Sequence, residues 1–216
     1  PRIGAHTPTT GGMAKRSIAY AQEIGAEAIQ VFTSKNEFRN ICELNHIDVI
    51  PYFKLDEKLK SEDISKIQFP VLTKPVDNGA GVGMKVAFNE KELIDNVNFA
   101  LTHSIRKEFQ TEKYMSECDD MLVYYTISDG NIYLSAAADR YTNKSQDVGS
   151  PVCIGSVYPS KYLNNYLDVV NQRMIELIMS TKILNGVLNI QFFVDKNKNF
   201  YAYDPGFRLQ GEAPHI

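Results

Sequence analysis

The chain has 216 residues, of which 44% are hydrophobic and 23% are charged, a balance typical of a globular domain. Its formal charge of −3 disfavours duplex DNA as a bulk electrostatic partner. No apolar run approaches the roughly 20 residues of a membrane helix, and the N-terminus carries no basic-then-apolar signal region. The three cysteines lie far apart and outside any CxxC motif, as reduced thiols do. We therefore expect a cytoplasmic protein without a membrane segment.

The first 34 residues have the order strand, helix, strand. Short apolar stretches at 2–7 and 28–32 flank a glycine pair and a segment, 13–24, with apolar residues at helical spacing. This order predicts one βαβ unit, the building block of parallel α/β folds.

From residue 35 onward the pattern is that of an α+β chain rich in antiparallel hairpins. Asn89 and Glu92 form a capping-box pattern, and Asp129-Gly130 is a strong hairpin signal. The span 55–66 is charged and predicts a helix or a solvated connector. Helices are expected at 36–44, at 90–101 and as one long amphipathic helix from 160. Strands are expected at 47–50, 69–74, 84–88, 112–115, 122–128, 131–138, 187–194 and 200–203.

A glycine-rich loop joins the strand candidates 69–74 and 84–88. Gly79, Gly81 and Gly83 stand at alternate positions, which fits neither a Walker A loop nor a dinucleotide-binding loop. We therefore predict a hairpin tip whose backbone N–H groups can approach a phosphate and which can act as a lid. Lys74, at the end of the preceding strand, could meet that phosphate; a flexible surface hairpin with an exposed lysine is the alternative.

From about residue 34 to 216 the chain resembles the ATP-grasp family, most of all its carbamoyl-phosphate-synthase and biotin-carboxylase branch. Five signatures occur in the family's order. They are Lys35 before the segment 46–51; Lys74 with Gly79, Gly81 and Gly83; the run Glu112, Lys113, Tyr114 and Met115; a carboxylate at Asp119 or Asp120; and two strands that carry Gln191 and Asp204, followed by Arg208.

This resemblance implies two α+β subdomains that enclose a nucleotide cleft, with ATP and Mg²⁺ as cofactors. Lys35 and Lys74 would hold phosphates, the run 112–115 would hold adenine, and Asp119 or Asp120 the ribose. Gln191 and Asp204 would bind Mg²⁺, and Arg208 would stabilise the transferring phosphoryl group.

The family's reaction converts a carboxylate to an acyl phosphate, which an amine or thiol then attacks. The expected partners are therefore ATP and a small carboxylate substrate. The particular carboxylate, the nucleophile and the oligomeric state stay open.

Two positions depart from the family's pattern. The family usually has glutamate where this chain has Asp204, and asparagine where it has Gly206. The shorter carboxylate and the missing amide favour an alternative in which the domain binds nucleotide without turnover.

Residues 1–34 resemble the opening strand, helix and strand of the endonuclease IV family, a zinc-dependent apurinic-site nuclease on a TIM barrel. The four histidines show no zinc-ligand spacing, and nothing after Thr33 resembles that family's ligands. We expect a composite chain, with this fragment at 1–34 and an ATP-grasp domain, cut at both ends, at 35–216. A remnant pre-domain or a fragment of a DNA-repair nuclease are the alternatives for the first segment.

Overall fold

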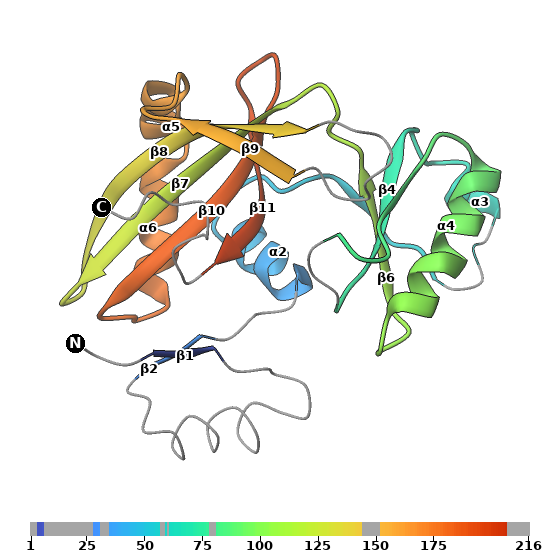
Figure 1. Ribbon diagram of the computed structural model, residues 1–216, viewed down its shortest axis with the longest axis horizontal. Helices are drawn as coiled ribbons and strands as arrows, with labels where there is room; N and C mark the ends of the chain where they lie inside the picture. The colour runs from blue at the N-terminus through green and yellow to red at the C-terminus, as the bar shows by residue number, and fades with distance from the viewer. Residues whose placement is uncertain are drawn as a thin grey trace.

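The computed structural model describes residues 4–6, 28–30, 35–56, 59, 61–77, 81–143 and 152–206. Its main body contains two antiparallel sheets, each covered on one side by helices (Figure 1). The larger sheet has five strands and the smaller one four. Helix α2 (Lys35–Leu44) lies between them.

The five-stranded sheet has the strand order β11-β10-β7-β8-β9. Its strands are β7 (Asp119–Ser128), β8 (Asn131–Asn143), β9 (Val152–Val157), β10 (Gly186–Val194) and β11 (Phe200–Gly206). Helices α5 (Leu163–Val169) and α6 (Asn171–Ser180) cover one face.

Alternation along β7 and β10 decides which side chains enter the core under these helices. Met121, Val123, Tyr125 and Ile127 of β7 pack with Leu188, Ile190, Phe192 and Val194 of β10. The Tyr166 ring of α5 lies edge-on to Phe192 at 5.4 Å between centroids, and its hydroxyl hydrogen-bonds Tyr125 at 2.7 Å. The residues between these core positions, such as Asp120 and Gln191, therefore point to the opposite face.

The four-stranded sheet has the order β3-β6-β4-β5. Its strands are β3 (Tyr52–Phe53), β4 (Val71–Pro75), β5 (Lys85–Ala87) and β6 (Phe109–Lys113). Helices α3 (Ser61–Ile64) and α4 (Glu90–His103) pack on one face over a core that includes Val71, Ala87, Leu93 and Val97. Lys74 and Glu112 alternate with these core positions and lie on the other face.

Helix α2 belongs to both halves of the molecule. Phe38 and Cys42 are buried in the core of the larger sheet, while Arg39 reaches the smaller one. Burial, aided by the charge of Glu43, raises the pKa of the Cys42 thiol to about 12. The helix therefore contacts both sheets through neighbouring residues of one turn.

Three local predictions are confirmed. The strands around the glycine loop pair antiparallel as β4 and β5. The side chain of Asn89 caps α4 by accepting from the N–H of Glu92 at 3.0 Å, and Glu92 in turn accepts from the N–H of Phe88. Asp129 and Gly130 both have positive φ, as a two-residue type I′ turn requires, and join β7 to β8.

Other predicted elements are wrong in detail. The strand expected at 112–115 is β6, which ends at Lys113. The single helix expected from residue 160 begins at Leu163 and is two helices that meet at Val170, whose φ of −114° departs from helical geometry. At 47–50 only Val49 forms an isolated bridge, to Ala202. Strand β9 was not predicted, because its six residues include Gly155 and show no regular alternation.

Near the N-terminus, β1 (Gly4–His6) and β2 (Ala28–Gln30) pair in parallel, as the predicted βαβ order requires. The helix expected at 13–24 lies outside the described residues. Within the part of the chain that the structure describes, no helix is long and apolar enough to cross a membrane.

Candidate functional site

In each sheet we call the face that α3 and α4, or α5 and α6, do not cover the open face. A buried ionic cluster lies on the open face of the smaller sheet. Lys74 of β4 and Arg39 of α2 both form ion pairs with Glu112 of β6, each to a different carboxylate oxygen. The three side chains are 8%, 7% and 2% exposed, respectively. Two cations thus share one carboxylate in a weakly solvated place, where their charge is poorly screened.

Two further side chains, those of Gln110 and Tyr52, contact Arg39. With its side-chain oxygen turned toward the guanidinium, the Gln110 amide accepts hydrogen bonds from it. The guanidinium carbon also lies 4.8 Å from the centroid of the Tyr52 ring. These contacts fix a cation that sequence analysis missed, although Arg39 lies one helical turn after Lys35, the spacing that places two residues on one helix face.

The glycine loop turns sharply on the same sheet. Gly81 and Gly83 have φ of +75° and +79°, a region that side-chain-bearing residues rarely adopt. A Cβ atom at Gly83 would approach Pro75 Cγ at 2.6 Å and His103 Cβ at 2.8 Å, so glycine is also required by space. Gly79 lies outside the described residues.

Asp77 anchors the start of this loop. Its carboxylate accepts from the backbone N–H of Arg106 at 2.9 Å. Burial alone would raise the pKa of Asp77, but the hydrogen bonds from Arg106, Ser104 and nearby backbone lower it overall. The loop is thereby tied to the turn after α4.

The segment that follows β6 connects the two sheets. Tyr114 donates its backbone N–H to the Pro70 carbonyl at 3.1 Å, and Lys113 donates to Pro51 at 2.8 Å. Met115 is 8% exposed and its carbonyl accepts from Cys118 in a turn. The predicted adenine-binding run 112–115 therefore spans the end of β6 and the beginning of this connection.

On the larger sheet the two predicted metal ligands stand side by side. Gln191 of β10 and Asp204 of β11 are direct partners in the antiparallel register. The Gln191 side chain is buried, whereas Asp204 is exposed. A bulge next to Gln191 leaves Tyr203 as an extra residue on β11, and its ring stacks on Phe193 at 4.3 Å.

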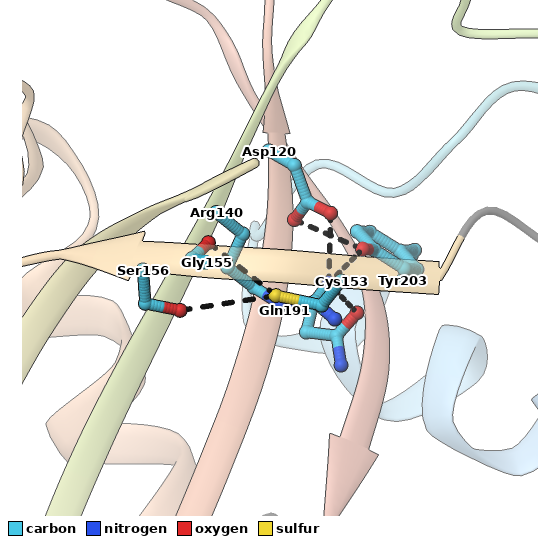
Figure 2. A network of polar contacts seen from close by, with 7 residues as sticks. All are labelled: Asp120, Arg140, Cys153, Gly155, Ser156, Gln191 and Tyr203. Atoms are coloured by element: carbon cyan, nitrogen blue, oxygen red, sulfur yellow. Dashed lines mark hydrogen bonds and ion pairs between the residues drawn. The ribbon is translucent and has the colours of Figure 1, made fainter. Parts of the chain in front are cut away.

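Arg140 of β8 joins these strands to β7. One of its terminal nitrogens donates to Asp120 Oδ2 at 2.7 Å, to Gln191 Oε1 at 2.8 Å and to the Tyr203 hydroxyl at 3.3 Å (Figure 2). Tyr203 donates to the other oxygen of Asp120 at 3.0 Å. Burial, with the charge of Asp120, raises the pKa of Tyr203 well above its usual value, so this hydroxyl stays a donor.

Alternation along β7 separates the two carboxylates between which sequence analysis left the choice open. Asp120 lies in the Arg140 network with Gln191. Asp119 points to the helical side, where it accepts from Tyr162 at 2.5 Å and pairs with Lys161 at 2.7 Å. Of the two, only Asp120 lies on the face that carries the predicted metal ligands.

The residues present fit a magnesium ion that arrives with phosphates. Among the residues described, no group of three His, Cys, Asp or Glu side chains could hold a metal by itself. Mg²⁺ commonly takes only one or two protein oxygens, with phosphates and waters completing its octahedron. The Gln191 carbonyl oxygen has two lone pairs, of which Arg140 uses one.

Part of the predicted site cannot be placed. Arg208 lies outside the described residues, and of Lys35 only the helical backbone is described. A cavity of about 630 Å³ lies beside residues 46–52 and another of about 350 Å³ lies between β8 and α5. Neither of these two cavities is lined by a predicted site residue, so the nucleotide cleft itself stays a prediction.

Comparison with known proteins places this geometry in context. The family of the carbamoyl-phosphate synthase L chain ATP-binding domain matches residues 34–215. The carbamoyl phosphate synthase large chain of Clostridium botulinum (strain Eklund 17B / Type B) is 25% identical over 159 residues, which cover 72% of this chain and 14% of that protein. The 2-oxoglutarate carboxylase small subunit of Hydrogenobacter thermophilus is 27% identical, covering 98% of this chain and 52% of its own length.

Solved structures show the same fold. The biotin carboxylase domain of the Hydrogenobacter thermophilus 2-oxoglutarate carboxylase, in complex with MgADP, ADP and bicarbonate, has a TM-score of 0.76 at 19% identity. That match covers 98% of this chain and 49% of the other. The chain thus spans about half or less of the length of these relatives.

Proposed function

The chain belongs to the ATP-grasp family of the carbamoyl-phosphate synthase L chain ATP-binding domain, and on this basis we propose that it binds Mg-ATP between its two sheets. We propose further that it is the nucleotide-binding part of a ligase that joins a small carboxylate to an amine or a thiol through an acyl phosphate. The observation that carries this proposal is the placement of Gln191 directly opposite Asp204, on the open face of one sheet. Lys74 and Glu112 occupy the open face of the other.

The ionic cluster of the smaller sheet suits the nucleotide. Lys74 and Arg39 bring two positive charges against the single carboxylate of Glu112, which leaves a surplus of one positive charge for phosphate. Because Glu112 holds the Lys74 ammonium in one place, little side-chain freedom remains to be lost when ATP binds. Lys35 is proposed as a further phosphate ligand, and the glycine loop at 79–83 as the lid.

The end of β6 is proposed to hold the nucleoside. Residues 112–115 pass from the smaller sheet into the connection between the sheets, and Met115 offers an apolar surface to adenine. The ribose hydroxyls are assigned to Asp120 rather than Asp119, since Asp119 is engaged on the helical side.

Gln191 and Asp204 are proposed to bind Mg²⁺ through their oxygens. When bound, the metal neutralises charge on the phosphates and orients them. Arg140 holds the Gln191 oxygen toward the open face, and Asp120 balances the charge of that guanidinium. Arg208 follows β11 in sequence and is proposed to stabilise the transferring phosphoryl group.

Calorimetric titration with Mg-ATP tests the nucleotide site. We expect saturable binding, weakened at least about tenfold by Lys74→Ala, which corresponds to ~1.4 kcal/mol. Lys91→Ala is the matched control, because Lys91 is an exposed lysine on α4, and its affinity should equal that of the unmodified chain. A folded chain that shows no saturable heat, or equal losses in both variants, would overturn the proposal.

Binding without turnover is the alternative that Asp204 and Gly206 favour. An aspartate is one methylene shorter than the family's usual glutamate, so it reaches a second metal less easily. ADP release in the presence of a panel of small carboxylates and amines separates the two readings. Binding with no release, even after Asp204→Glu, would identify a nucleotide-binding module.

We propose separately that residues 1–34 form a unit of their own, which resembles the beginning of the endonuclease IV family. The parallel pairing of β1 with β2 is compatible with such a βαβ unit. The biotin carboxylase match covers 98% of the chain, so it takes in most of this segment as well and supports a pre-domain of the ligase instead. Measuring the bound zinc of the purified chain and titrating it with an abasic DNA duplex test the nuclease hypothesis. A chain that contains no zinc and does not bind the duplex would contradict it.

A further inference from the structure

Arg39 is a buried cation that lies outside the five sequence signatures. Its guanidinium pairs with one carboxylate oxygen of Glu112, while Lys74 pairs with the other. One cation is enough to neutralise this carboxylate, so the second leaves a net positive charge in a weakly solvated place. Burying such a charge costs free energy unless an anion compensates it. The excess charge therefore points to an anionic ligand beside the cluster.

The hydrogen bonds of Lys74 lead to the same conclusion. An ammonium group can donate three hydrogen bonds. Among the residues that the structure describes, the Lys74 ammonium donates to one acceptor, Oε1 of Glu112. Its side chain is only 8% exposed, so bulk water solvates the ammonium poorly. The remaining donors of Lys74 are therefore suited to the oxygens of a ligand.

The nitrogens of Arg39 are directed at protein groups instead. With its oxygen turned toward Arg39, the Gln110 amide accepts from Nε, Nη1 and Nη2 of the guanidinium, and Nη2 also pairs with Glu112. The Tyr52 ring, 4.8 Å from the guanidinium carbon, adds a cation–π contact. A guanidinium keeps its proton in proteins, so the charge is permanent. Arg39 is thus a fixed positive charge that is held against Glu112.

We infer that Arg39 is a positioning residue of the phosphate site and acts through Glu112. By pairing with the second oxygen of Glu112, Arg39 offsets the charge of this carboxylate, so that the charge and the remaining donors of Lys74 serve the phosphates of the nucleotide. Without Arg39, Glu112 and Lys74 form a neutral one-to-one pair, which attracts phosphate less. This inference rests on the proposed function, and it assigns Arg39 no contact with the nucleotide.

Arg39→Gln tests the inference, because it removes the charge and keeps a hydrogen-bond donor. Competition against a fluorescent ADP analogue gives the affinities for ADP in EDTA and for adenosine, and their ratio reports on the phosphates alone. We expect ADP affinity to fall at least about tenfold, which corresponds to ~1.4 kcal/mol, while adenosine affinity stays within about a factor of two. Arg173→Gln is the matched control, because Arg173 is an exposed arginine on α6, and it should change neither affinity.

A second change, at Glu112, separates this role from a direct phosphate contact or a purely structural role. Arg39→Gln/Glu112→Gln removes one cation and one carboxylate together, so the cluster regains the net charge of the unmodified chain. The ratio of ADP to adenosine affinity should therefore rise at least about threefold above that of Arg39→Gln. Thermal unfolding shows which variants fold. If Arg39→Gln alone does not fold, the double variant is compared with the unmodified chain, whose ratio it should match within about threefold.

The two failures are distinguishable. If the folded, unmodified chain binds neither ADP nor its analogue, the proposed function fails. If it binds ADP, and Arg39→Gln leaves the ratio of ADP to adenosine affinity unchanged, Arg39 has only a structural role and this inference is overturned. A double variant that does not show the expected ratio also overturns it.

Discussion

Among the described residues, the open faces of the two sheets carry different sets of charged side chains. On the smaller sheet two cations, Arg39 and Lys74, lean on one carboxylate. On the larger sheet one cation, Arg140, lies against the carboxylate of Asp120, and a second carboxylate, Asp204, is exposed beside the network.

This difference agrees with the proposal that the two faces bind different parts of one ligand. The two cations of the smaller sheet suit phosphate oxygens, while the carboxylate and amide oxygens of the larger sheet suit a divalent cation. The buried cluster of the smaller sheet is also the more enclosed of the two, so disturbing its charges should cost more stability. Four measurements test this difference between the two faces.

The largest effect is expected from Glu112→Gln. The change leaves the buried Arg39 and Lys74 without the carboxylate that they share, and removing one partner of such a pair costs about 3–5 kcal/mol. Urea unfolding followed by circular dichroism measures the loss. Glu117→Gln is the control, because that glutamate pairs with Lys196 on the surface and should leave the transition in place. If both variants unfold at the same urea concentration, the buried ion pairs of Glu112 do not contribute this stability and the prediction is wrong.

A smaller loss, about 1–3 kcal/mol, is expected from Arg140→Met in the same assay. Asp120 then loses its guanidinium but keeps the hydrogen bond from Tyr203, which limits the penalty. Mg-ATP binding should weaken too, because the Gln191 oxygen is no longer oriented. A loss larger than that of Glu112→Gln would reverse the proposed ranking of the two faces.

The third test replaces one glycine by alanine in each of the two sheet regions. Gly83→Ala places a side chain at positive φ against Pro75 and His103, and should cost at least about 1–2 kcal/mol. Gly155 of β9 has nothing within 4 Å of a built Cβ, so Gly155→Ala should be close to neutral. Thermal unfolding compares the two. Similar melting temperatures would mean that the glycine loop is not confined as described.

The smallest effect concerns pH. Because hydrogen bonds to the ionised form lower the pKa of Asp77 in the folded chain, its contribution is present above the ordinary pKa of about 3.8 and is lost as the pH falls through the lower folded value. Between pH 7 and pH 3 the unmodified chain should therefore lose slightly more melting temperature than Asp77→Asn. Parallel slopes in the two proteins would contradict the assignment.

Local chemistry made most of the fold predictable. The Asn89 cap, the turn at Asp129-Gly130 and the hairpin around the glycine loop depend on a few adjacent residues, and all three are present. The break at Val170 and strand β9 depend on packing against other elements, for which a continuous amphipathic pattern or a short glycine-containing strand gives little sign.

For the candidate site, too, the sequence predicted the residues but not the contacts between them. The order of motifs predicted Lys74, Glu112, Gln191 and Asp204, and the structure places them on two open faces. That Lys74 and Glu112 pair with each other, and that Arg140 ties Asp120 to Gln191, depends on strand register between residues far apart in the chain. The contact of the Asn189 side chain with Gly206 was hidden for the same reason, since only the pairing of β10 with β11 brings them together.

Helix α2 has a mechanical consequence. Phe38 and Cys42 are buried in the core of the larger sheet, while Arg39 forms an ion pair with Glu112 on the smaller one. The chain itself passes between the sheets at 47–52 and again at 114–118. Any motion that separates α2 from the smaller sheet must therefore first break the ion pair between Arg39 and Glu112.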